Sequence, residues 1–155
     1  MRLIIVTVFL AFLGACTPTI PLSPGLSDRM DVAGAQLNRS DSIAIINHLR
    51  ITKGVARLSL DTDLNEKAQK LANQYGATGV SPKKPKGVAQ IRTSAGYVNF
   101  AQTFSGWRNE KVSEEVLIDA NYSRAGIGVA YAANSKSGTY WVLLLASGST
   151  IAVAQ

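Results

Sequence analysis

The sequence has one cysteine, Cys16, and one histidine, His48, among its 155 residues. A single cysteine cannot form an internal disulfide bond, which excludes the small exported scaffolds that several such bonds hold together. With His48 as the only imidazole, a Ser-His-Asp or Cys-His arrangement has almost nothing to use. The chain must therefore be stabilised by its own hydrophobic core, and it is long enough to form one.

The sequence also lacks an N-terminal apolar run long enough to cross a membrane. Residues 3–13 are uncharged and apolar, but these 11 residues fall short of the roughly 20 that a transmembrane helix needs. Arg2 gives the run a positive start, and Gly14 and Ala15 place small side chains directly before Cys16. These features are typical of a secretory signal peptide, which we predict over residues 1–15.

The four residues Leu-Gly-Ala-Cys at positions 13–16 resemble the lipobox of bacterial lipoproteins. The resemblance implies that the Cys16 thiol receives a diacylglycerol and that Cys16 becomes the acylated N-terminus, anchored in a membrane. Thr17 is similar to the residues that allow forwarding to the outer membrane in double-membraned bacteria, where an aspartate would resemble a retention signal. The alternative is an incidental cysteine beside an ordinary cleavage site or a membrane anchor.

Charge and motifs limit the expected partners. Cleavage would leave 140 residues with 15 basic and 10 acidic side chains, a net charge of +5, because Arg2 is the only charge lost. A basic surface favours anionic envelope polymers or lipid headgroups, but it equally serves solubility alone. We expect no nucleic-acid partner, since no such motif is visible. No glycine-rich phosphate loop precedes a helix, and we expect no cofactor.

Composition divides the chain into three parts. Residues 17–38 hold three of the five prolines together with Ser, Thr and Gly. This composition predicts an irregular tether. We therefore expect a signal peptide over residues 1–15, the lipidated cysteine and tether over residues 16–39, and one folded domain over residues 40–155.

Helix signals dominate the first half of the predicted domain. Ser40 or Asp41 is placed to cap a first helix that runs to about residue 52 and ends at Gly54. His48 lies off the apolar stripe of this helix, so we expect it to be exposed to solvent. The stripe consists of Ile43, Ile46 and Leu49.

A second helix is expected to begin after Asp63 and to end at Gly76. Residues 81–86 contain two prolines and three lysines, which predicts a loop. Aromatic residues three to four apart predict a third helix over residues 97–107, and residues 113–118 predict one further turn.

The pattern then changes to that of strands. Residues 126–132 and 139–146 flank a loop rich in turn residues, which predicts a β-hairpin. Residues 88–92 predict an edge strand, and residues 151–154 predict a short end strand. Helices followed by an antiparallel hairpin indicate a layered α+β domain.

Short motifs in this order resemble the CAP superfamily (cysteine-rich secretory proteins, antigen 5 and pathogenesis-related proteins). They are most similar to its bacterial branch, the SCP-like extracellular domains. The resemblance covers about residues 40–147 and implies an α-β-α sandwich around a small antiparallel sheet. The residues that carry it are Asn47-His-Leu-Arg50, Gly54, Leu58, Asp61, Leu64, Ala68-Gln69, Trp107, the stretch 117–128 and Tyr140-Trp141.

The family commonly has a cleft of two histidines and two acidic residues that can hold a divalent metal. The resemblance places Leu71 and Ser113 at the histidine positions, and Ala89, with Gln90 beside it, at one acidic position. Only Glu110, three residues after Trp107, retains an acid. A single carboxylate cannot build a zinc site, so we expect a degenerate cleft without metal.

These observations predict a non-enzymatic, lipid-anchored domain of the cell envelope that binds an envelope protein, lipid or glycan. One alternative is a lipid or sterol carrier, as some relatives of the family are. A second is a hydrolase that acts on envelope polymers through Glu110. Most aromatic residues should lie in the core, but one or two could line a groove for a glycan or lipid. The aromatic residues of this half are Tyr97, Phe100, Phe104, Trp107, Tyr122, Tyr131, Tyr140 and Trp141.

Overall fold

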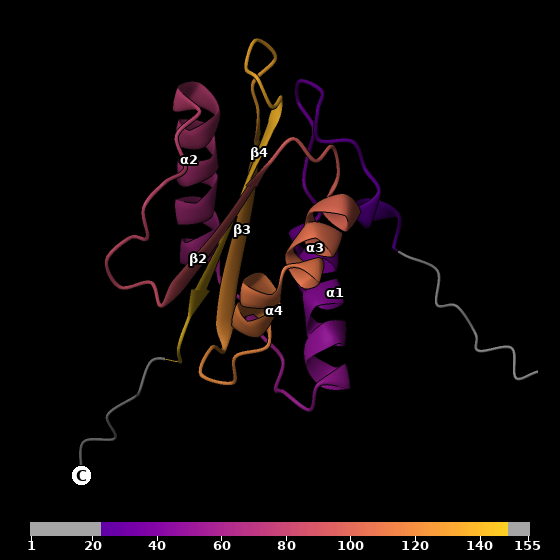
Figure 1. Ribbon diagram of the computed structural model, residues 1–155, viewed down its shortest axis with the longest axis vertical. Helices are drawn as coiled ribbons and strands as arrows, with labels where there is room; N and C mark the ends of the chain where they lie inside the picture. The colour runs from indigo at the N-terminus through magenta and orange to yellow at the C-terminus, as the bar shows by residue number, and fades with distance from the viewer. Residues whose placement is uncertain (1–22, 149–155) are drawn as a thin grey trace, which may run out of the picture.

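The computed structural model describes residues 23–148 (Figure 1). The predicted signal peptide, Cys16 and the predicted strand over residues 151–154 lie outside the described residues. Within residues 23–148, no helix is both long enough and apolar enough to cross a membrane.

Helix α1 (Arg39–Thr52) begins before both predicted caps. Its cap is Asn38, whose side-chain oxygen accepts a hydrogen bond from the Asp41 amide at 3.0 Å, so the predicted caps Ser40 and Asp41 are wrong. Gly54 follows the helix with a φ of 72°, a left-handed conformation that favours glycine. His48 is exposed, as predicted.

Helix α2 (Thr62–Thr78) is capped by Asp61 rather than Asp63. The Asp61 carboxylate accepts a hydrogen bond from the Leu64 amide at 2.9 Å and pairs with Arg124 at 2.8 Å. The amide hydrogen bond is the largest of the influences that lower the pKa of Asp61 below its ordinary value. The helix also passes through Gly76, where we predicted its end, and stops at Gly79, which has a φ of 68°.

Three shorter helices complete the helical part. Helix α3 (Phe100–Asn109) is capped by Asn99, and helix α4 (Lys111–Leu117) follows after Glu110, close to the two predicted segments. A single 3-10 turn, η1 (Pro24–Leu26), precedes α1.

The four strands form one sheet in the order β1-β3-β4-β2. Strands β3 (Arg124–Tyr131) and β4 (Thr139–Ala146) are the predicted hairpin, and β2 (Gln90–Ala95) is antiparallel to β4. Strand β1 (Ser59–Leu60) was not predicted, and it pairs in parallel with the start of β3. The sheet is therefore antiparallel except at this edge.

The helices cover both faces of the sheet (Figure 1). Helix α2 lies on one face, while α1, α3 and α4 lie on the other. Strand β4 is buried along its whole length and sends alternate side chains into the two layers. Val142 and Leu144 pack beneath α2, and Trp141 and Leu143 pack beneath the other helices. This arrangement confirms the predicted α+β class and the α-β-α sandwich.

The packed structure begins earlier than the predicted boundary at residue 40. Leu26 and Met30 are each only 3% exposed and belong to the core that lies beneath α1 and α3. The Met30 amide also donates a 2.7 Å hydrogen bond to the Val98 carbonyl. Apolar side chains in this proline-rich stretch therefore fix part of the predicted tether to the domain.

Candidate functional site

The position on α2 that the resemblance assigns to a cleft histidine holds Leu71. This side chain is partly buried and packs against the apolar cluster between α2 and the sheet, which includes Val88 and Val142. Ile91 of β2 packs against the same cluster. Leu71 therefore contributes hydrocarbon packing at this position and has no atom that ligates a metal or transfers a proton.

Ala89 precedes and Gln90 begins strand β2, and several of their polar atoms take part in hydrogen bonds. The Ala89 amide donates to the Leu145 carbonyl at 2.9 Å, and the Ala89 carbonyl accepts from Lys84 Nζ at 3.0 Å. The Gln90 side-chain oxygen accepts from the amide of Ile91 at 3.1 Å. The Ala89 amide thus extends the hydrogen bonding between β2 and β4 by one residue.

Glu110 and Ser113 lie together at the junction between α3 and α4. The buried Ser113 hydroxyl donates a short hydrogen bond to the Glu110 carboxylate. The Glu110 carbonyl also accepts the amide of Glu114 at 2.9 Å, the first hydrogen bond of α4. The one acid that the resemblance retains is thus a solvent-exposed residue that helps to start a helix.

The residues at these positions do not fit a divalent metal. Together they supply one carboxylate and no imidazole, whereas zinc takes three or four nitrogen, sulfur or oxygen ligands. Elsewhere in residues 23–148, no three residues among His, Cys, Asp and Glu come together in a group that could hold a metal ion. We therefore assign no metal chemistry to this region.

Two motif residues of α1 have roles that sequence reasoning missed. The Asn47 side chain exchanges two hydrogen bonds with the main chain of Leu58, at 2.7 and 2.9 Å. Arg50 is fully buried, and its guanidinium donates to four main-chain carbonyls at 2.7–3.0 Å. Burial lowers the pKa of Arg50 from its ordinary value. Both residues are buried and connect segments of the fold through main-chain hydrogen bonds.

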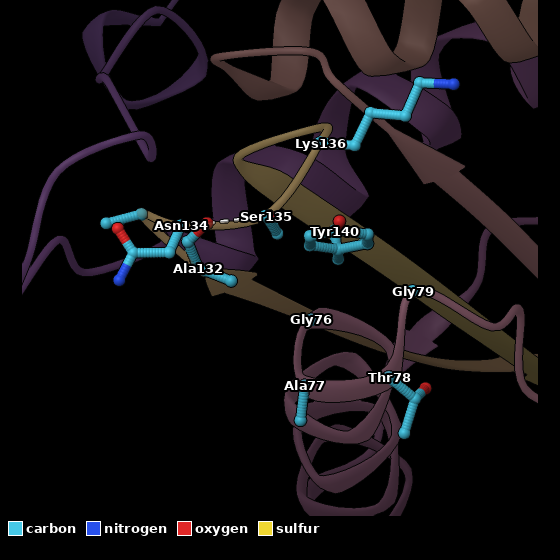
Figure 2. A pocket seen from close by; sticks show the side chains of 10 residues that line it. Gly76, Ala77, Thr78, Gly79, Ala132, Asn134, Ser135, Lys136 and Tyr140 are labelled. Atoms are coloured by element: carbon cyan, nitrogen blue, oxygen red, sulfur yellow. Dashed lines mark hydrogen bonds between the residues drawn. The ribbon is translucent and has the colours of Figure 1, made fainter.

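A cavity of about 520 Å³ lies between the C-terminal end of α2 and the β3–β4 loop (Figure 2). Its lining is mostly small, because Gly76 and Gly79 of α2 and the alanines at 132 and 133 leave space. Tyr140 stands at its base, and a hydrogen bond from Ser135 is the largest of the influences that lower the pKa of its phenol.

The polar groups of this cavity serve mainly the loop itself. Ser135 Oγ donates to the Ala132 carbonyl at 2.7 Å and accepts the Gly138 amide at 3.1 Å. Lys136 is the one cation of the lining, and Figure 2 shows its side chain extending away from Gly76 and Tyr140. The cavity has room for a small molecule, but it presents no nucleophile activated by a neighbouring base.

Comparisons with known proteins agree with this fold. The family described as CAP, the cysteine-rich secretory protein family, matches residues 43–145. No match to a curated protein was found.

Three solved structures illustrate the likeness. MpPR-1i has a TM-score of 0.58 at 19% identity, covering 69% of this chain and 88% of that chain. An outer surface protein from Borrelia burgdorferi has a TM-score of 0.54 at 18% identity, covering 74% of this chain and 99% of that chain.

An extracellular SCP-domain protein from Bacillus anthracis has a TM-score of 0.56 at 13% identity, covering 70% of this chain and 40% of that chain. At these identities the structures establish the fold alone. The family match spans most of the folded domain, from α1 to the end of β4. The chain therefore belongs to the CAP, or cysteine-rich secretory protein, family.

Proposed function

We propose that this protein is a lipid-anchored, extracytoplasmic CAP domain that binds an envelope partner or ligand and catalyses no reaction. The observation that carries the proposal is the chemistry at the four cleft positions. Leu71 packs in an apolar cluster, Ala89 has no functional group, and Glu110 and Ser113 bond to each other. A binding role needs no activated nucleophile or metal, and the domain presents neither at these positions.

Its proposed location has two supports. The sequence Leu-Gly-Ala-Cys at positions 13–16 is similar to a lipobox, and Thr17 favours the outer membrane if the source has two membranes. Two proteins of the same fold are described as an outer surface protein and an extracellular protein. Both supports favour attachment on the outer side of a cytoplasmic membrane.

The test of a non-catalytic domain uses the purified full chain. We expect zinc and calcium at micromolar concentration to leave its melting temperature unchanged, because the cleft positions supply one carboxylate. We also expect no hydrolysis of peptidoglycan or peptide, and no difference between the wild type and Glu110→Gln. A melting temperature raised by several degrees with zinc, or hydrolysis that Glu110→Gln abolishes, would contradict the proposal.

Native mass spectrometry of the same preparation separates a binding domain from a lipid carrier. We expect the chain to carry no stoichiometric free lipid beyond its own acyl groups. One lipid or sterol molecule bound per chain would instead identify a carrier.

A further inference from the structure

A groove of about 420 Å³ runs along the exposed side of α3, and its main feature is an exposed tyrosine. Tyr97 is 38% exposed, whereas the neighbouring aromatic residues Phe100, Phe104 and Trp107 are buried. An aromatic ring left at the surface in a domain that buries its neighbours offers apolar area to a ligand. The groove is lined by Tyr97, Ala101, Gln102, Ser105, Gly106 and Asn109.

The Tyr97 ring lies against α3 at Gly106. A Cβ atom at Gly106 would lie 2.8 Å from Tyr97 Oη and 3.0 Å from a ring carbon. Only glycine at this position lets the ring rest against α3 without displacement. Glycine weakens a helix by about 1 kcal/mol relative to alanine, so its presence in the middle of α3 trades helix stability for this ring position.

The main chain of Tyr97 is also fixed. Its carbonyl accepts two hydrogen bonds, from Thr139 Oγ at 2.6 Å and from Trp141 Nε1 at 2.8 Å. Both donor residues are buried in the sheet. A ring whose main chain is held by buried donors and whose outer atoms lie close to a helix is preorganised, which reduces the entropy lost on binding.

Beyond the Tyr97 ring, the groove is lined by neutral polar side chains of α3. The Gln102 side-chain oxygen accepts the Val98 amide at 3.2 Å, which sets the amide orientation and leaves its nitrogen without a protein partner in residues 23–148. Ser105 and Asn109 are exposed, and their side chains likewise have no hydrogen-bond partner in the described part of the chain. From Gln102 to Asn109 the helix rises by about 10 Å, at 1.5 Å per residue.

We propose that this groove binds a neutral oligosaccharide. Sugar rings present C–H groups on their faces, which pack on an aromatic ring, and hydroxyls at their edges, which need donors and acceptors. Amide and hydroxyl side chains supply both, and no charged side chain lines the groove. A proline-rich peptide is bound by a groove lined with several aromatic rings, whereas this groove has one.

This inference names a ligand for the binding domain proposed above, and in that respect it rests on that proposal. Its test is binding in solution by the purified full chain, which does not depend on the anchor or on the absence of catalysis. Failure of this test would remove the glycan and leave the rest of the proposed function standing.

The experiment is isothermal titration calorimetry with N-acetylchitotetraose, cellotetraose and maltotetraose as probes. We expect at least one of them to bind with a Kd of about 1 mM or tighter. Tyr97→Ala should weaken that binding about ten-fold, because it removes the stacking surface. Tyr97→Phe keeps the ring and should stay within about three-fold of the wild type.

Two further variants distinguish a loss of binding at the groove from nonspecific effects of substitution on the protein. Gly106→Ala favours the helix and therefore folds, but it displaces the ring and should weaken binding. Tyr131→Ala is the matched control, since Tyr131 is 40% exposed at the end of β3 and does not line the groove. Binding of none of the three probes at about 10 mM, or binding that Tyr97→Ala leaves unchanged, would overturn the inference.

Discussion

Arg50 shows how a residue can mark a family in the sequence and yet have a purely architectural role. Its four acceptors are the carbonyls of Ala56, Leu117, Asp119 and Tyr122, the last three about 70 positions along the chain. Within residues 23–148 no carboxylate forms a salt bridge with it, so no charge pattern in the sequence could have predicted these partners. The guanidinium fits because its five donors lie in one plane. It fixes the turn between α4 and β3 to the end of α1.

Arg50→Met should lower the free energy of unfolding by at least about 3 kcal/mol, because four buried or partly buried hydrogen bonds to main-chain carbonyls lose their charged donor. Urea unfolding at neutral pH measures this difference. Arg57→Met is the control, since Arg57 is exposed and has no hydrogen-bond partner in residues 23–148, and it should change stability by less than about 0.5 kcal/mol. Equal effects of the two substitutions would contradict the role of Arg50.

The position of Tyr97, like the partners of Arg50, could not be predicted from the local sequence pattern. Its spacing from Phe100 and Phe104 placed it on the apolar stripe of a helix over residues 97–107. The helix begins only at Phe100, because Asn99 caps it by accepting the Gln102 amide at 3.0 Å. Tyr97 therefore lies outside the helix and its ring turns to the surface. The spacing of apolar residues predicts which residues share a helix face, but it does not fix the residue at which the helix begins.

At the scale of elements, the close approach of α2 to β3 depends on two glycines. A Cβ at Gly126 would lie 2.2–2.5 Å from Leu64 and the Asn65 amide, and one at Gly128 would lie 2.5–2.6 Å from the main chain of Ala68 and Gln69. These are main-chain clashes of a helix against a strand, and no rotamer change relieves them. The glycines therefore set the distance between the two layers.

Gly126→Ala should destabilise the domain by about 3 kcal/mol, the upper part of the range for overpacked cores. Thermal or urea unfolding measures the loss. Gly76→Ala is a control within α2, because its Cβ would meet Tyr140 and two alanines at ordinary contact distances of 3.4–3.5 Å. That change should be neutral or stabilising by up to about 1 kcal/mol. The prediction fails if the two variants have the same stability.

The elements themselves were predictable to different degrees. Each α-helix and the hairpin came from local sequence signals, and the structure confirms them with shifted ends. Strand β1 was missed because it has two residues and its existence depends on pairing with β3. The end of α2 was misplaced at Gly76, because the helix continues through this residue to Thr78 and is capped by Gly79. Long-range contacts decide such cases, and a local pattern does not contain them.

At the cleft positions, too, local features were predictable and features that depend on distant contacts were not. That Leu71 belongs to an apolar helix face follows from its spacing within α2. The hydrogen bond between Ser113 and Glu110 depends instead on a break between two helices that we predicted only approximately. The cavity at the hairpin depends on how two distant segments meet, so the sequence offered no signal for it.

At the scale of the whole molecule, the proposed anchor limits where the domain can be. Seven residue steps separate Cys16 from Ser23, the first described residue. Whatever their conformation, seven steps span at most about 25 Å. This is less than the roughly 30 Å diameter of a small domain. A domain held by lipid on Cys16 therefore stays beside the bilayer, and its ligands must be reachable there.

Energy transfer from the domain to acceptor lipids in proteoliposomes tests this limit. We expect strong transfer from a donor on Asp28→Cys, because Asp28 is exposed and lies five residues beyond Ser23. A Gly/Ser insertion of about 20 residues before Ser23 should lower the transfer, since flexible chains extend with the square root of their length. Cys16→Ser should abolish both transfer and recovery with membranes. Transfer that Cys16→Ser leaves intact would mean that another part of the chain holds the protein at the bilayer, and the lipid anchor would have to be abandoned.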